Sequence, residues 1–487
     1  MNALLTLLYI LLCVGIIIFA PTLVAAYADY GQFTGFDAAK AVLLCTALGF
    51  LAGLFAYKRE VDAIFLLRLL VAGLIARMVI GFAIFAFHGQ DFFGGDAVTY
   101  DFFGTAQLLG WQGDKYYLTV ANQFVRSGQG SGWGMVYVVA AIYGFVGRNL
   151  LAVQLVNSVL GAATAVIIYD CAHQVFQNSR VARISALAVA FYPSLVLWSA
   201  QGLKDGPIVF CLALAILATL RLGAKLSIRY ILVLILSLIA LIALRFYVFY
   251  MICAAIVGAF VIGMQQVSAT SFVRQFSAVV LIGLALTYVG VTRSATVQFE
   301  HYGNMQVLQR SRSDLARSAE SGFGRDVDVS TTSGAISTIP LGILYLLFAP
   351  FPWQITSLRQ SITLPEMLIW WMSFPLLVVG LWFAIKYRLR MISPILIFTV
   401  MLTLAYSVFQ GNVGTAYRQR AQLLVFYFIF VSVGFVLLKE KREERKHREL
   451  MDRQEVELRR VAKRQQRTGI EFNNSPEKSS HPQELNY

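Results

Sequence analysis

Long apolar runs, separated by short polar or charged turns, constrain the fold of this chain more than any other feature. A helix that spans a bilayer needs about 20 mostly apolar residues, with roughly 17 as the lower limit. A backbone inside a membrane must satisfy its own hydrogen bonds, so runs of this length predict helices. We therefore expect an all-α, polytopic integral membrane protein with about 12 transmembrane helices. The runs cover residues 3–26, 41–57, 64–87, 149–171, 183–200, 206–222, 229–246, 248–265, 275–292, 366–388, 391–409 and 420–438.

The composition agrees with a membrane protein. The chain is 58% hydrophobic and 14% charged, whereas about a quarter of the residues of a soluble domain are charged. A net charge of +14 would suggest nucleic acid as the partner of a soluble protein. Here the Lys and Arg residues cluster between apolar runs and in the tail, so we expect no nucleic acid partner. The five cysteines lie in or beside apolar runs without CxxC spacing, which supports neither a disulfide framework nor a zinc knuckle.

Two shorter runs, 133–147 and 340–352, decide the topology. If neither crosses, the short and densely basic loops all fall on one side, and the positive-inside rule places that side in the cytoplasm. If both crossed, the basic loops at 180–183 and 221–229 would become external. We therefore expect 133–147 and 340–352 to be interfacial helices in the outer loops. The expected setting is a bacterial inner (plasma) membrane, with both termini cytoplasmic.

Three regions follow from this pattern. Residues 1–87 form an N-terminal three-helix membrane segment, whose first run lacks a positive start and is expected to remain as an anchor. Residues 88–438 are expected to form the main transmembrane core. Residues 439–487 form a cytoplasmic tail in which acid and base alternate at helical spacing, with disorder expected from about 468 onward.

The first long polar interruption, residues 88–131, contains the leading functional candidate. Gly94 and Gly95 place Asp96 in a tight turn, and Tyr100 follows one helical turn later. A carboxylate beside a membrane is costly to keep there without a task. The alternative is a solvated loop that only joins two spans.

The expected topology brings basic residues from distant segments to the same outer side. Lys204 and Asp205 precede one span, Arg245 interrupts an apolar run, and Arg418 and Arg420 follow a polar turn. Arginines on the outer side break the positive-inside pattern, and an anionic ligand would account for them. The alternatives are snorkelling for Arg245 and a helix-capping role for Asp205.

The order of these motifs resembles the GT-C superfamily of polyprenyl-phosphate-dependent integral membrane glycosyltransferases. The resemblance rests on Gly94-Gly95-Asp96 with Tyr100, then a span ending in Tyr192-Pro193, and then Gly202-Leu203-Lys204-Asp205-Gly206, and it covers about residues 88–222. It implies that Asp96 and Asp205 are the two acidic residues of the active centre. The chain departs from the family pattern because three spans, and not one, precede the acidic loop.

Sugar transfer from a lipid phosphate to a hydroxyl needs a base for the nucleophile and positive charge on the departing phosphate. Asp96 and Asp205 are therefore the expected catalytic residues. Tyr100, Lys204, Arg245, Arg418 and Arg420 are the expected substrate-binding residues. Carboxylates of residues 88–114 and 205 could share a divalent cation, but their spacing requires none, so metal ligands and cofactor remain unassigned.

The expected function is transfer of a sugar from a polyprenyl-phosphate-linked donor to a saccharide, lipid or protein acceptor on the external face. Such a step belongs to the synthesis of exopolysaccharide or another cell-envelope glycoconjugate. The alternatives are a lipid-linked polysaccharide polymerase and a non-enzymatic transporter or flippase of lipid-linked saccharide. A transporter would place its charges near the bilayer midplane, whereas these lie at the ends of spans. The chain has no nucleotide-binding motif in a strand–turn–helix context.

Overall fold

The computed structural model describes residues 33–59, 61–87, 89–93, 95–126, 132–262, 269–288, 290, 304–317, 321–355 and 357–468. Over these residues the chain is helical, and its one piece of β-structure is an isolated bridge between Gly322 and Asn412. The all-α prediction is confirmed. The first expected span, 3–26, lies outside the described residues.

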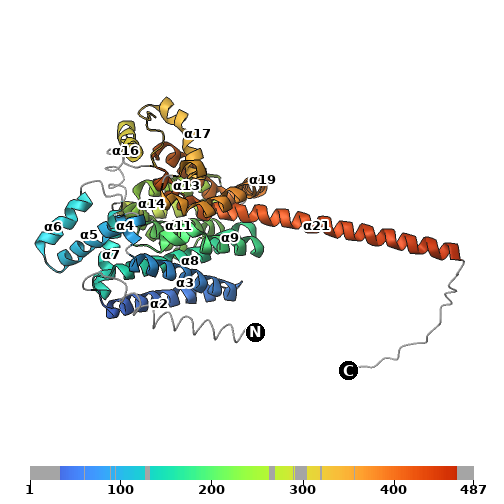
Figure 1. Cartoon of the computed structure of the whole chain (residues 1–487), viewed down its shortest axis with the longest axis horizontal. Coiled ribbons are helices and arrows are strands. Elements are labelled where there is room, and N and C mark those ends of the chain that lie inside the picture. The colour runs from blue at the N-terminus through green and yellow to red at the C-terminus, as the bar shows by residue number, and fades with distance from the viewer. Residues whose placement is uncertain are drawn as a thin grey trace, which may run out of the picture. The chain divides into compact units, whose positions relative to one another are not determined.

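The described helices are labelled in Figure 1. They are α2 (Gly35–Tyr57), α3 (Ala63–Ala86), α4 (Gly89–Phe93), α5 (Asp96–Trp111), α6 (Lys115–Arg126), α7 (Trp133–Val146), α8 (Leu150–Phe176), α9 (Ser179–Phe191), α10 (Pro193–Ser199), α11 (Asp205–Ala224), α12 (Ile228–Leu244), α13 (Phe246–Ile262), α14 (Ala269–Tyr288), α16 (Met305–Arg317), α17 (Thr332–Phe348), η1 (Pro352–Gln354), α18 (Leu358–Ser361), α19 (Leu364–Phe409), α20 (Val413–Gln419) and α21 (Ala421–Thr468).

Among the described residues, six helices are long and apolar enough to cross a membrane, or seven if the bent pair α9 and α10 is one span. The chain is therefore a multi-pass membrane protein, with fewer spans of full length than the about 12 expected. Helices α12 and α13, with 17 residues each, lie at the lower limit of length for a spanning helix and are not among these six. The runs 133–147 and 340–352 also form short apolar helices, α7 and α17, and α17 begins earlier than expected, at Thr332.

Helix α19 counts once among the six, yet it folds back on itself. Its backbone leaves the helical region at Arg388 (φ −135°, ψ 18°), inside the basic turn expected between two spans. Trp370 and Thr403, on either side of this break, both contact Tyr427: the Trp370 ring centroid is 6.3 Å away, and the Thr403 hydroxyl bonds the Tyr427 hydroxyl at 2.7 Å. On a straight helix they would lie about 50 Å apart. Residues 364–409 are therefore two antiparallel helices.

Helix α8 is the centre of the first bundle. It packs against α2, α3, α9 and α11, which lie side by side in Figure 1, and most of its length is buried. Asn149 begins it by accepting a hydrogen bond from the Ala152 amide at 3.1 Å. Its Asn157 amide donates to the carbonyls of Gln201 (2.7 Å) and Leu203 (2.8 Å). These two bonds fix the loop that leads into α11.

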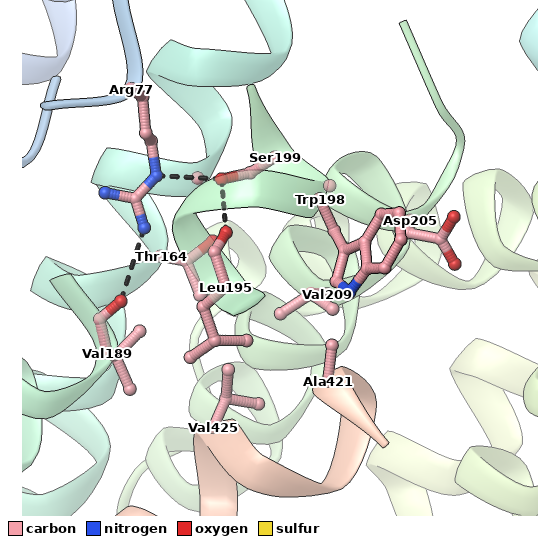
Figure 2. Close-up of a pocket in the computed structure, with 12 residues that line it drawn as sticks. Arg77, Thr164, Val189, Leu195, Trp198, Ser199, Asp205, Val209, Ala421 and Val425 are labelled. Atoms are coloured by element: carbon pink, nitrogen blue, oxygen red, sulfur yellow. Dashed lines mark hydrogen bonds between the residues drawn. The ribbon is translucent and has the colours of Figure 1, made fainter. Parts of the chain in front are cut away.

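The helix ahead of that loop is broken at Pro193, where α9 and α10 meet at 55°. Proline removes a backbone donor and leaves carbonyls of the preceding turn without helical partners. Arg77 of α3 supplies donors: it bonds the carbonyls of Ala190 at 2.8 Å and Val189 at 3.3 Å, and its Nε donates to the Ser199 hydroxyl at 2.8 Å (Figure 2). A cavity of about 20 Å³, large enough for about one water molecule, lies beside Arg77, with Trp198 and Asp205 also in its wall.

Helices α5 and α7 pack together outside this bundle. Asp101 on α5 accepts a hydrogen bond from the Tyr143 hydroxyl at 2.5 Å and pairs with Arg148 at 2.5 Å. Gly104 allows the close approach, because a Cβ there would lie 2.4 Å from Val139. Asp101 thus ties α5, whose first residue is Asp96, to the chain that follows α7.

The chain divides into two compact units, Met1–Gly434 and Phe435–Tyr487. In the second unit the helix continues to Thr468, and residues 441–463 have exposed side chains. Pairs four residues apart, such as Arg459 with Glu455 at 2.6 Å, support it as a solvated helix. The disorder expected after about residue 468 falls outside the described residues.

The hairpin in α19 makes a topological prediction. Single cysteines at Leu389 and Ser227, in a variant whose native cysteines are replaced, should react with a membrane-impermeant maleimide from the same side. A cysteine at Thr415 should react from the opposite side, as should Ser127 and Ser318, which lie outside the described residues. Positive-inside topology predicts that the cysteine at Thr415 reacts in intact cells, whereas the cysteines at Leu389 and Ser227 react only after permeabilisation.

A Leu389 cysteine that reacts from neither side would show that residues 364–409 cross as one span. External reaction at Ser227 would reverse the central topology.

Candidate functional site

Arg418, on the short helix α20, joins two carboxylates from distant parts of the chain. Its Nη1 donates to Asp96 Oδ2 at 2.7 Å, and its Nε donates to Asp205 Oδ2 at 2.6 Å. Burial lowers the pKa of this guanidinium, but the charges of Asp205 and Asp96 outweigh burial, so the pKa lies above its ordinary value. Arg418 is therefore always charged and is the centre of the site.

The two carboxylates differ in exposure. Asp96 opens α5, where the unpaired amides of a helix N-terminus favour negative charge, and 52% of its side chain is exposed. Asp205 opens α11, but only 1% of its side chain is exposed. The structure thus brings both expected acids to one guanidinium, with Asp96 on the solvent side and Asp205 beneath.

Arg245 is the second partner of Asp205. It lies in extended backbone between α12 and α13, and its Nη2 is 3.4 Å from Asp205 Oδ1. The residue is 4% exposed, so snorkelling to the interface does not describe its position. Tyr406 and Tyr247 are its other neighbours, the latter with its ring centroid 5.7 Å from the guanidinium carbon, but the Arg245 Nε and Nη1 atoms make no hydrogen bond within the described part of the chain. A buried cation with unused donors is suited to an anionic ligand.

Lys204 and Tyr100 meet beside Gly132, which has a positive φ of +126°. A Cβ on Gly132 would lie 2.7 Å from Lys204 Nζ and 2.9 Å from the Tyr100 hydroxyl, so only glycine leaves room for both. Burial, followed by the charge of Arg245, lowers the pKa of Lys204 to about 7. Burial, followed by the charges of Asp96 and Asp205, raises the pKa of Tyr100, which remains a hydroxyl donor.

Together these residues form a site with surplus positive charge. Arg418, Arg245 and protonated Lys204 face two carboxylates, Asp96 and Asp205. An anion can therefore enter without leaving uncompensated negative charge.

Arg420 is placed elsewhere. Its guanidinium is fully buried and donates to the carbonyls of Leu347 at 2.9 Å and Ala349 at 3.2 Å, at the end of α17. It also lies 4.9 Å from the ring of Tyr417. The sequence grouped Arg420 with Arg418 because they are two residues apart, but on a helix residues at that spacing face different directions. Arg420 holds helix ends together: in the described part of the chain its guanidinium bonds Leu347, Ala349 and Met367, and not Asp96 or Asp205.

Two features of the site were not anticipated from the sequence. Trp198 lies under Arg418, with the guanidinium carbon 5.9 Å from its ring centroid, and it shares the small cavity with Asp205 (Figure 2). Glu366, at the start of α19, is buried and accepts a hydrogen bond from the Tyr417 hydroxyl at 2.7 Å. Glu366 could have been singled out from the sequence, because an acidic residue at the start of an apolar run is rare.

The sequence left open a divalent cation shared by carboxylates of residues 88–114 and Asp205, but the described residues contain no matching cluster of ligands. No group of three His, Cys, Asp or Glu side chains there is arranged to hold a metal ion. The Asp96 and Asp205 carboxylates share Arg418 instead.

Comparison with known proteins gives one family. No curated protein matches the chain. Residues 133–290 match the model of the dolichyl-phosphate-mannose-protein mannosyltransferase family. The matched stretch contains Lys204, Asp205 and Arg245, while Asp96, Tyr100 and Arg418 lie outside it. The resemblance to the GT-C superfamily of membrane glycosyltransferases is thereby confirmed over residues 133–290 of this multi-pass membrane protein.

Proposed function

We propose that this protein is a membrane glycosyltransferase that moves a sugar from a polyprenyl-phosphate-linked donor to an acceptor on the external face. The acceptor is a saccharide, a lipid or a protein, and the product is a cell-surface polysaccharide or glycoconjugate. The observation that carries the proposal is the linked cluster Asp96–Arg418–Asp205–Arg245. The family match over residues 133–290 supports the same class of donor.

In this proposal Asp96 is the general base. It is the more exposed acid and lies at a helix start next to Gly95, where no side chain blocks a substrate. Asp96 takes the proton of the acceptor hydroxyl, whose oxygen forms the new bond to the anomeric carbon. The bond from that carbon to the phosphate oxygen breaks, and the lipid phosphate leaves with the electron pair. A single inverting displacement of this kind needs one base and no covalent intermediate.

Asp205 has a different proposed role from the one the sequence suggested. Both of its oxygens face guanidinium groups, at 2.6 Å from Arg418 and 3.4 Å from Arg245. We assign it to holding those two arginines in place for the phosphate. The donor phosphate then lies among Arg245, Lys204 and Arg418, with the Tyr100 hydroxyl as a further donor.

Lipid-linked intermediates in cells lacking the protein test the function itself. The proposal expects the polyprenyl-phosphate sugar donor to accumulate. Accumulation of lipid-linked repeat units would indicate a polymerase, and an unchanged lipid profile would contradict a donor-consuming enzyme.

We predict that Asp96→Asn lowers the transfer rate by about 100-fold to 10,000-fold, the usual contribution of a general base. Asp114→Asn is the matched control: it removes a charge from the same polar segment, and the Asp114 carboxylate accepts hydrogen bonds from the amides of Tyr116 and Tyr117. Transfer is measured with purified protein and donor lipid. An Asp96→Asn enzyme as active as the control would remove Asp96 from the base role.

Arg245→Ala should abolish transfer while the protein still inserts, because the donor phosphate loses a buried cation. Arg245→Lys should recover part of the activity, since charge is the required property. Inserted protein is quantified by immunoblot and by size-exclusion chromatography. Full activity in Arg245→Ala would place the phosphate site elsewhere.

Lys204 predicts a pH dependence of donor affinity. With a pKa of about 7, Lys204 is charged below pH 7 and neutral above it. Affinity for the donor lipid, a phosphodiester whose charge is constant near neutrality, should therefore fall as the pH rises through about 7. In Lys204→Met this step should disappear and the affinity should stay at the lower level. If the affinity of Lys204→Met still falls through pH 7, the group that titrates is not Lys204.

A further inference from the structure

We propose that Arg418 exchanges partners when the donor binds: the lipid phosphate takes its Nη1 group from Asp96 and so releases Asp96 to act as base. This inference rests on the proposed function and adds an order to it. The donor phosphate must arrive before the acceptor hydroxyl can be deprotonated. Without donor, Asp96 Oδ2 is engaged by Arg418 Nη1 at 2.7 Å, so this oxygen is not open to the acceptor hydroxyl.

Arg418 pairs with both Asp205 and Asp96, and these two ion pairs differ in burial. The difference decides which of the two pairs can break. The Asp205 side is 1% exposed and has a second arginine behind it. The Asp96 side is 52% exposed and faces solvent. Breaking a buried pair leaves an uncompensated charge, while a pair at an exposed carboxylate contributes little. Arg418 therefore remains on Asp205 through Nε and can exchange its Nη1 partner.

The backbone that carries Arg418 is held at both ends, so the side chain can change partners without the helix moving. At the start of α20, the Phe323 amide bonds the Gly411 carbonyl at 2.8 Å and the Val413 amide bonds the Ser321 carbonyl at 3.1 Å. Arg312 adds a bond to the Gln410 carbonyl at 2.7 Å. After α20, Arg420 is fixed to the end of α17.

Competition for one guanidinium predicts the direction in which phosphate affinity changes when Asp96 is replaced. If Asp96 and a phosphate compete for Arg418, removing the Asp96 charge should strengthen phosphate binding. Simple repulsion between Asp96 and the phosphate predicts the same gain, so a single variant does not separate the two causes. The separation needs a double-mutant cycle with Arg418.

The probe is farnesyl monophosphate, titrated calorimetrically into the full chain in detergent micelles, with farnesol as the ligand that lacks the phosphate. We expect Asp96→Asn to bind the monophosphate about threefold to tenfold more tightly than the unaltered protein, and Asp114→Asn to bind it equally. In an Arg418→Gln background the Asp96→Asn gain should vanish. If Arg418→Gln does not fold, Arg418→Lys makes the same test, because its single ammonium is held by the buried Asp205.

A gain that persists at full size with Arg418 replaced would show through-space repulsion and overturn the exchange, while leaving the proposed function intact. Equal affinity in the Asp96→Asn and unaltered proteins would overturn the exchange in the same way. If no form binds the monophosphate more tightly than farnesol, the proposed donor class fails and the exchange fails with it.

Discussion

The buried carboxylate of Asp205 is the constraint on which the site depends. With 1% of its side chain exposed, it is stable as an anion only because Arg418 and Arg245 compensate its charge. Those arginines come from α20 and from the break between α12 and α13, so one acid fixes the relation of three distant segments. Arg418 then extends the link to a fourth segment, at Asp96.

Much of the surrounding fold keeps Asp205 in that position. Pro193 bends the preceding span, Arg77 satisfies the carbonyls freed by the bend, and Asn157 holds the loop that leads to Lys204. These contacts use polar groups in an apolar bundle, where each would be costly without a partner. Broken helices with satisfied backbone groups are how a membrane protein can present a polar site at the end of its spans.

Most of the fold that could be predicted from the sequence was predicted from the length of the apolar runs. This length predicted the helical class, and the expected runs within the described residues fall on helices, although 183–200 is broken at Pro193 into α9 and α10, and 366–388 and 391–409 are the two arms of α19. Run length could not show that the backbone is extended at Arg245, between α12 and α13, where the side chain pairs with the buried Asp205. The turn at Arg388 was readable, since basic residues mark the turn between two runs.

The sequence singled out several residues that the structure brings together, whereas their pairings could be read only from the structure. Asp96, Asp205, Arg245 and Arg418 were found because charges beside apolar runs are rare. Asp205 is 40 residues away from Arg245 in sequence and 213 residues away from Arg418. No local pattern encodes such pairings. For the same reason Arg420 could not be separated from Arg418 by its sequence context.

The central claim is that these distant segments form one phosphate site. A cryo-electron microscopy structure of the full chain with a bound polyprenyl monophosphate tests it most directly. The account predicts phosphate density among Arg245, Lys204 and Arg418, with Arg418 still on Asp205 and the Asp96 carboxylate free. Phosphate bound away from these three cations, with the Asp96–Arg418 pair intact, would contradict it.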